Sequence, residues 1–140
     1  MAASDDLDAF LAGRRNLIVA GVRADGRPHL TPNWFVWDGA HFYVSTTRGR
    51  LKYAIFLKNP RAQLMIDDPA GLRAVLIPAT VEIREDPAAE LSRFRAIRAK
   101  YGLNELSDSE HLESLIDEGR VLFVITPEGP PSTWTSWGFG

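Results

Sequence analysis

The chain of 140 residues has the size of one domain, and 45% of its residues are hydrophobic, which is enough for a core. Its 16 basic and 18 acidic side chains give a net charge of −2, so no overall positive field favours nucleic acid, and any anion site must be local. The absence of cysteine excludes a disulfide framework, thiolate catalysis and a cysteine-ligated metal, and it fits a reducing, cytoplasmic location.

The N-terminal segment MAASDDLDAFLAG predicts a short amphipathic helix that is capped by Ser4 and ends at Gly13. This segment is acidic and has neither a basic start nor a long apolar run, so we expect no signal peptide. No apolar run approaches ~18 residues anywhere in the chain, so we expect no membrane-spanning segment.

Three strands joined by two tight turns are the clearest architectural signal. They cover residues 15–23, 28–38 and 40–47, and Asp25-Gly26 and Asp38-Gly39 lie between them. Asp-Gly pairs between alternating apolar runs favour β-hairpins. Pro32 cannot donate a ladder hydrogen bond, so the second strand should be bent or lie at an edge.

The remaining pattern predicts a mainly β fold with inserted helices. Strands are expected at residues 61–67, 72–85 and 120–126, and helices at about 50–58, 87–102 and 107–119, the last capped by Ser107. Six strands with helices inserted late favour a small antiparallel barrel, formed by one domain of residues 1–140, over a parallel α/β sheet.

Several aromatic residues have more than one possible place. Trp34 and Trp37 are three apart on one predicted strand, so they should face opposite sides, one in the core and one at an interface or pocket. The Pro- and Ser-rich tail carries Trp134, Trp137 and Phe139, and aromatics in such a tail usually dock on a surface. That surface is either the tail's own subunit or a partner's pocket.

The segment STTRGRLK predicts an anion-binding site at the start of a helix. Hydroxyls, a glycine and cations lie at the start of a predicted helix, whose first N–H groups are unpaired. A helix start that binds no anion would favour acidic residues over these cations, because the helix dipole already places partial positive charge there. Arginine can bind two phosphate oxygens at once. The alternative is that these cations are only solvated. The candidate residues are Ser45, Thr46, Thr47, Arg48, Gly49, Arg50 and Lys52.

Other catalytic motifs are not evident. His29, His41 and His111 are far apart in the sequence, so no metal site is expected. His29 flanks the second strand and could touch a substrate, although a half-exposed strand residue is the simpler interpretation. We find no Ser–His–Asp pattern, phosphate-binding P-loop or GxGxxG motif, and no residue stands out as a catalytic acid or base.

The order of elements and the stretch GVRADGRPHLTPNWFVWDGAHFYVSTTRGRLKYAIFLKNPRAQLMIDD resemble the pyridoxamine 5'-phosphate oxidase-like split β-barrel family. The chain is most similar to the short branch of probable F420 (deazaflavin)-dependent oxidoreductases. The resemblance covers Leu17 to Arg84 well and the rest in outline. Its sharpest element is TTRGRLK before NPRA.

The resemblance implies a homodimer with two cofactors at the subunit interface. Arg50 and Lys52 match the family's phosphate clamp, and the three hydroxyl residues 45–47 line the same pocket. The ring of the cofactor would lie along the second strand at Thr31, Pro32, Asn33 and Trp34. Ile55-Phe56 replaces the Asn-Leu of many relatives, and the Arg-Leu-x-Pro type C-terminal segment of true pyridoxamine-phosphate oxidases is missing, which argues against vitamin B6 chemistry.

The resemblance therefore implies a reductase that transfers a hydride between coenzyme F420 and a small organic substrate. From charge, cysteine content and hydropathy we expect a cytoplasmic location and neither nucleic acid nor membrane as partner. Arg48 would meet the carboxylates of the deazaflavin tail at the rim. The alternatives are an FMN-dependent reductase or oxidase of the same fold, and a non-enzymatic flavin or deazaflavin carrier or sensor.

Overall fold

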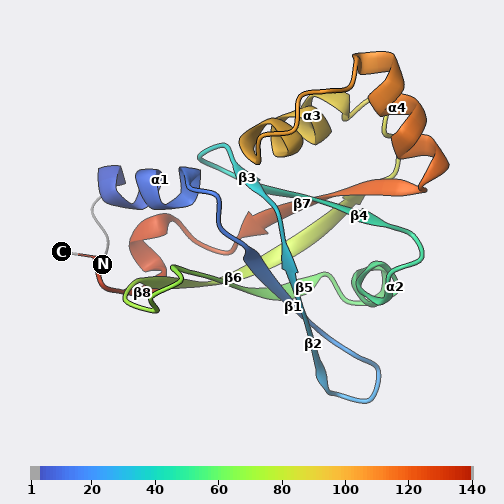
Figure 1. The fold of residues 1–140 in the computed structure, drawn as a ribbon. Coiled ribbons are helices and arrows are strands. Elements are labelled where there is room, and N and C mark those ends of the chain that lie inside the picture. Colours follow the sequence, from blue (N-terminus) through green and yellow to red (C-terminus); the bar gives the residue numbers. More distant parts are fainter. Residues whose placement is uncertain (1–3, 140) are drawn as a thin grey trace.

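The computed structural model describes residues 4–139, and Figure 1 shows how its elements are arranged. In chain order they are α1 (Ser4–Ala12), β1 (Leu17–Val22), β2 (Pro28–Asn33), β3 (Val36–Trp37), β4 (Phe42–Thr47), α2 (Leu51–Lys58), β5 (Arg61–Asp67), β6 (Ala74–Arg84), α3 (Leu91–Lys100), α4 (Asp108–Asp117), β7 (Arg120–Pro127), a 3₁₀ turn η1 (Pro131–Thr133) and β8 (Thr135–Trp137). The predicted hairpin turns at Gly26 and Gly39 are confirmed, and both glycines have positive φ.

The strands form one antiparallel sheet that curls on itself. Its order is β2-β1-β5-β6-β7-β4-β3, with β8 paired to β6. The two ends of this path, β2 and β3, are separated by only Trp34 and Phe35. Such a link spans roughly 10 Å, so the two edges must approach each other and the sheet must bend into a half-barrel. Pro32 lies on the edge strand β2, as predicted.

The prediction of six strands was wrong in number. The predicted second strand divides into β2 and β3, because its last two residues pair with β4 at the opposite edge of the sheet. The tail contributes β8, whose Thr135–Trp137 segment pairs with the start of β6. The third predicted helix begins at Leu91 rather than Pro87, after a turn at residues 87–90.

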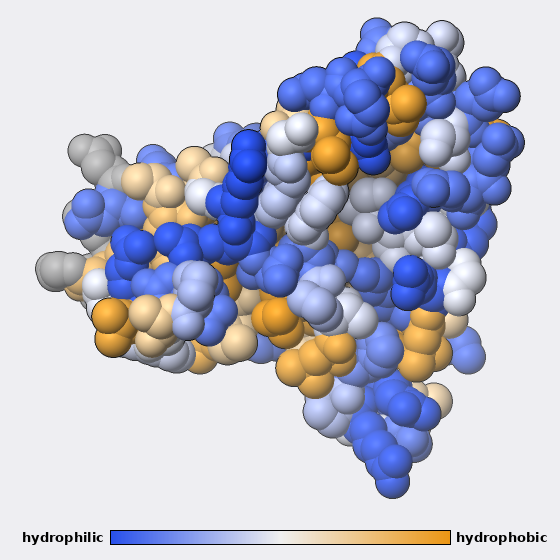
Figure 2. Space-filling model, in the orientation of Figure 1, coloured by the Kyte–Doolittle hydropathy of each residue, from blue (hydrophilic) through white to orange (hydrophobic). Residues whose placement is uncertain are grey.

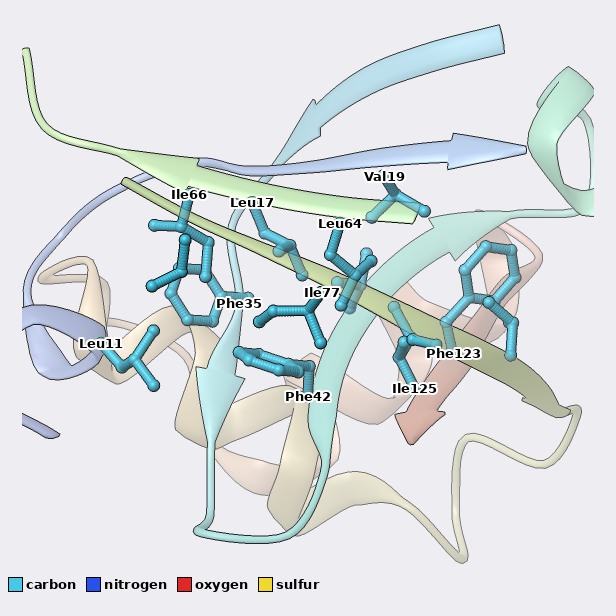
Figure 3. Packing of buried hydrophobic residues seen from close by; sticks show 14 of the residues in the cluster. Leu11, Leu17, Val19, Phe35, Phe42, Leu64, Ile66, Ile77, Phe123 and Ile125 are labelled. Carbon is cyan, nitrogen blue, oxygen red and sulfur yellow. The ribbon is translucent and has the colours of Figure 1, made fainter. Parts of the chain in front are cut away.

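Two apolar clusters cover the two faces of the sheet. The larger lies inside the curl and includes Phe35, Phe42 and Phe123, each fully buried (Figure 3). Helix α1 closes one end of it with its apolar residues Leu7, Phe10 and Leu11. The predicted capping by the Ser4 side chain lies outside what the structure describes. The smaller cluster packs α3 and α4 on the outer face of β4 and β7.

Helix α2 packs closely on β1 through Ile55 and Phe56, which are buried. A Cβ placed on Gly21 of β1 would lie 2.8 Å from Phe56 Cζ and 2.9 Å from Ile55 Cγ2. The two apolar residues that distinguish this helix therefore fill the space above a glycine, which no larger residue could share without a shift.

We expect Gly21→Ala to destabilise the fold by about 1–3 kcal/mol, the usual cost of overpacking. Gly49→Ala is the matched control, because a Cβ there meets nothing within 4 Å and the residue has no positive φ. Urea unfolding of both variants measures the difference. Equal unfolding midpoints would contradict the close packing of α2 on β1.

The tail packs mainly on its own subunit. Trp134 is 5% exposed and lies in the inner core against Trp37 and Phe42, with ring centroids 5.5 and 6.1 Å away. Phe139 contacts Phe10 edge to face at 5.1 Å. Only Trp137, 48% exposed, presents a large apolar surface outward. Of the two predicted places for the tail aromatics, the structure supports the tail's own subunit for Trp134 and Phe139.

Within residues 4–139, no helix combines the length and apolar character needed to cross a membrane.

Candidate functional site

A cavity of about 740 Å³ lies where β2, β4, α2, α3, α4 and the start of β7 meet. This volume is within the usual range for small-molecule and cofactor sites. Its lining residues are His29, Thr31, Pro32, Asn33, Trp34, Ser45, Thr46, Arg50, Leu51, Lys52, Phe94, Ile97, Arg98, His111, Ser114, Leu115, Glu118 and Arg120.

Lys52 is held at one end of the cavity by neutral oxygen atoms. Its side chain is only 9% exposed. Its Nζ donates to Asn33 Oδ1 and lies 3.4 Å from Thr31 Oγ1. Asn33 is itself fixed, since its Nδ2 donates to the carbonyl oxygens of Leu17 at 3.2 Å and Thr31 at 2.9 Å. The strand β2 therefore orients the ammonium group.

Positive charge exceeds negative charge around Lys52. Burial, together with the nearby cations Arg50 and Arg120, lowers the pKa of Lys52 to about 8. Neither Lys52 nor Arg50 forms an ion pair within residues 6–139, whereas Arg120 Nε donates to Glu118 Oε2 at 3.0 Å. Three cations thus share one carboxylate, and such an arrangement is suited to a bound anion.

Two further features complete the anion end. Arg120 Nη1 lies 3.4 Å from Ser45 Oγ, across the β4–β7 pair. Helix α2 begins directly after Arg50, which has extended backbone angles, makes no side-chain cap and is followed by no acidic residue in the first turn. The unpaired N–H groups of that turn add partial positive charge beside the cations.

The neighbouring wall is aromatic. Trp34 is 44% exposed and lines the cavity. Its ring stacks on Tyr101 with centroids 4.6 Å apart and an interplanar angle of 6°. Tyr101 is anchored in turn, because its hydroxyl donates to the Arg15 carbonyl and accepts from the Phe35 N–H. Trp34 therefore offers a fixed flat surface to a ligand.

The division expected for the two tryptophans is confirmed, but for another reason. Trp37 packs against the core and Trp34 lines the cavity. The chain leaves β2 after Asn33 and enters β3 at Val36. The two rings are therefore separated by this break in the strand, and not by the alternation of side chains along one strand.

The structure brings most of the sequence candidates together. Eight of them line the cavity: Thr31, Pro32, Asn33, Trp34, Ser45, Thr46, Arg50 and Lys52. Thr47, Arg48 and Gly49 do not line it: Thr47 is the last residue of β4, and Arg48 and Gly49 lie on the exposed turn between β4 and α2. Arg48 contacts Glu85 instead, through Nε to Oε1 at 3.1 Å and Nη2 to the carbonyl oxygen at 3.0 Å. A Cβ at Gly49 would meet open space, so no neighbouring atom in this subunit requires a glycine at this position.

Sequence reasoning missed the part of the site contributed by the second half of the chain. Arg120 reaches the anion end because β7 pairs with β4, placing Arg120 opposite Thr47. The α3–α4 wall, with His111 and Arg98, also lay outside the prediction. His29 lines the cavity and is a partly exposed residue of β2, so the simpler interpretation is confirmed, and its contact with a substrate stays a prediction. Among the side chains of residues 6–139, no three from His, Asp or Glu cluster as a metal site would require.

A half-barrel of antiparallel strands with a cavity that is cationic at one end and aromatic at its side defines a split-barrel domain with a candidate ligand site. The family model of pyridoxamine 5'-phosphate oxidase matches residues 3–129, and the chain belongs to this family. The comparison with curated proteins gave no match.

Solved structures of the same fold include an F420 reductase, which is 25% identical over 87% of this chain and 93% of its own, with a TM-score of 0.70. The conserved hypothetical protein Rv2991 from Mycobacterium tuberculosis is 22% identical over 98% of this chain and 85% of its own, with a TM-score of 0.81. The heme storage protein HutZ from Vibrio cholerae is 20% identical over 100% of this chain and 98% of its own, with a TM-score of 0.77.

Proposed function

We propose that the chain is an oxidoreductase that binds the deazaflavin coenzyme F420 in this cavity and exchanges a hydride with a small organic substrate. The observation that carries the proposal is the excess of positive charge around the buried Lys52, where Lys52, Arg50 and Arg120 share one carboxylate at the end of a cavity with a flat aromatic wall. The similarity to an F420 reductase supports it.

The residues present fit such a cofactor. Lys52, Arg50 and Arg120 would hold the phosphate with charge-assisted hydrogen bonds, and the Ser45 hydroxyl adds a further donor. Pro32 and Trp34 would lie along the tricyclic ring. When bound, the deazaflavin supplies the hydride chemistry, while the protein positions it and shapes the substrate pocket.

FMN is the second candidate, and the number of cations favours it. FMN ends in a dianionic monoester, whereas the deazaflavin carries a monoanionic diester followed by an acidic tail that must leave the cavity. Three cations converge at one end, which suits the higher charge of FMN. In addition, Arg48 contacts Glu85 rather than the cavity, so its expected role at the deazaflavin tail gains no support from this subunit.

The pH dependence of cofactor affinity should report on Lys52. Its pKa of about 8 belongs to the protein without an anion, and a bound phosphate raises it by favouring the ammonium form. The affinity gained from this charge is therefore complete below about pH 8 and is lost as pH rises above it, by at most tenfold per pH unit. Titrations of the deazaflavin from about pH 6.5 to 9.5 test this, and Lys52→Met should flatten the profile. A pH-independent affinity in the parent protein would contradict the role of Lys52.

We also propose a homodimer, with apolar surface near the cavity as the contact. Val22 and Leu30 on the β1–β2 hairpin and Leu51 and Leu57 on α2 are each about half exposed. Figure 2 shows apolar patches over this projecting hairpin and beside α2 on a mostly hydrophilic face. Light scattering at micromolar concentration should give the mass of two chains, and the mass of one chain would contradict the proposal.

A hydride-transfer assay tests the proposed activity. The protein is loaded with reduced deazaflavin and mixed with a panel of enones, quinones and tetrapyrroles, while the absorbance of the oxidised cofactor is followed. We expect faster oxidation with at least one substrate class than in free cofactor. Tight binding without transfer to any member of the panel would instead favour a carrier or sensor.

A further inference from the structure

One face of helix α4 forms the wall of the cavity that lies away from Lys52. His111, Ser114, Leu115 and Glu118 line the cavity, and their spacing places them on one side of a helix. Glu118 is next to the anion end because it bonds Arg120. His111 precedes it by two turns, which is roughly 10 Å along the helix axis. The cavity therefore has a second end, beside His111.

The imidazole of His111 is enclosed and yet has no partner. The residue is 4% exposed, and neither ring nitrogen hydrogen-bonds to another group within residues 6–139. In that part of the chain no fully enclosed polar side-chain atom lacks a partner, so both nitrogens must keep contact with open space. A histidine that serves only the core would normally be hydrogen-bonded. His111 lines the cavity and also a much smaller hollow formed by α3 and the loop between α3 and α4, so its ring has unused hydrogen-bonding capacity at the border of the two.

The surroundings of His111 are apolar and electrically balanced. Phe94, Ile97 and Leu115 line the same end. The two nearest cations are already paired, Arg98 with Glu105 and Arg95 with Asp108. In contrast to Lys52 and Arg50, they leave no charge for an anionic ligand. Burial and these arginines lower the pKa of His111, so the ring is neutral near pH 7 and offers one donor and one acceptor.

We propose that this end of the cavity binds the organic substrate, an uncharged and largely apolar molecule with a carbonyl oxygen, and that His111 donates a hydrogen bond to that oxygen. This inference rests on the proposed function, since it divides one cavity between a cofactor at the cationic end and a substrate at the His111 end. It makes His111 a substrate-binding residue and predicts discrimination against carboxylates and sulfonates.

Nuclear magnetic resonance of the histidine rings tests the inference directly. The chain has only three histidines, and the signal of His111 is assigned by its loss in His111→Phe. The probe is menadione, an uncharged quinone, added to protein loaded with oxidised deazaflavin so that no turnover occurs. We expect the His111 signals to shift while those of His41 stay in place, because His41 bonds Thr126 and does not line the cavity.

Affinities give the second readout. His111→Phe should weaken menadione binding about fivefold to tenfold, the value of one hydrogen bond, and His111→Gln should recover part of it. Deazaflavin affinity should change less than twofold in both variants. His41→Phe is the control and should change neither affinity. The anionic 1,4-naphthoquinone-2-sulfonate should bind the loaded protein at least tenfold more weakly than menadione.

The two proposals can fail separately. Menadione titrations are also made without deazaflavin. If the protein does not bind deazaflavin but menadione still shifts the His111 signals, the cofactor assignment is refuted while the substrate site at His111 is supported. If deazaflavin binds but menadione does not shift the His111 signals, the substrate site at His111 is refuted while the cofactor assignment is supported. Equal affinity of His111→Phe and the parent protein for menadione would also overturn it.

Discussion

Replacing Lys52 with methionine is expected to weaken deazaflavin binding about tenfold to a hundredfold while leaving the fold intact. The lost interaction is a charge-assisted hydrogen bond to phosphate, worth about 1.5–3 kcal/mol. Calorimetric titration of the variant and the parent protein measures it. Arg50→Ala should act in the same direction with a smaller effect, because the Arg50 side chain is exposed and solvated.

Two opposing effects keep the stability of this variant near that of the parent. A pKa lowered from 10.5 to about 8 means that the charged Lys52 costs the folded state about 3 kcal/mol at neutral pH, and methionine removes this cost. The same change leaves Asn33 Oδ1 without its donor, which costs about 1–3 kcal/mol. We therefore expect the free energy of unfolding to change by no more than about 1–2 kcal/mol.

Lys58→Met is the matched control for this experiment. Lys58 lies in the last turn of the same helix and is exposed. It carries the same charge and does not line the cavity. Its replacement should leave cofactor affinity within twofold. Equal affinity of Lys52→Met and the parent protein would show that the phosphate binds elsewhere.

The largest loss of stability is expected from Trp134→Ala, about 3–5 kcal/mol, the usual cost of removing a large buried aromatic ring. Trp134 fills the inner core beside Trp37 and Phe42, and its Nε1 donates to the Gly129 carbonyl at 3.0 Å. The alanine variant leaves both a void and an unpaired carbonyl. Thermal and urea unfolding measure the change.

Trp137→Ala provides the comparison, because Trp137 belongs to the same tail but is 48% exposed. Its removal should cost less than about 1 kcal/mol. If both variants lost the same stability, the tail would not be anchored in its own subunit through Trp134. A loss in Trp134→Ala that appeared only in the dimer would instead place this side chain on the partner.

Local sequence signals were sufficient for much of the fold. The Asp-Gly pairs predicted both hairpins, and Pro32 predicted an edge strand, because these effects depend on backbone angles and missing donors within a few residues. The break at Trp34-Phe35 could not be predicted in this way. It arises because the chain crosses from one edge of the curled sheet to the other, and that crossing depends on pairings between distant segments.

For the candidate site, too, the sequence predicted the local motif but not the residues that join it from distant segments. The cations and hydroxyls around the start of α2 were visible as a continuous motif, and Lys52, Arg50 and Ser45 do line the cavity. Arg120 joins them only through the pairing of β7 with β4, and His111 only through the packing of α4. The motif also included Arg48, whose orientation is set by Glu85, a residue 37 positions away. Spacing in the sequence does not determine such long-range partners.

Calorimetric titration of the parent protein with the deazaflavin and with FMN tests the central claim most directly. The proposed function predicts saturable binding of the deazaflavin, at one site per chain, with an affinity at least equal to that for FMN. It also predicts that Lys52→Met weakens that binding. FMN binding at least tenfold more tightly than the deazaflavin would contradict the assignment and establish FMN as the cofactor of this cavity.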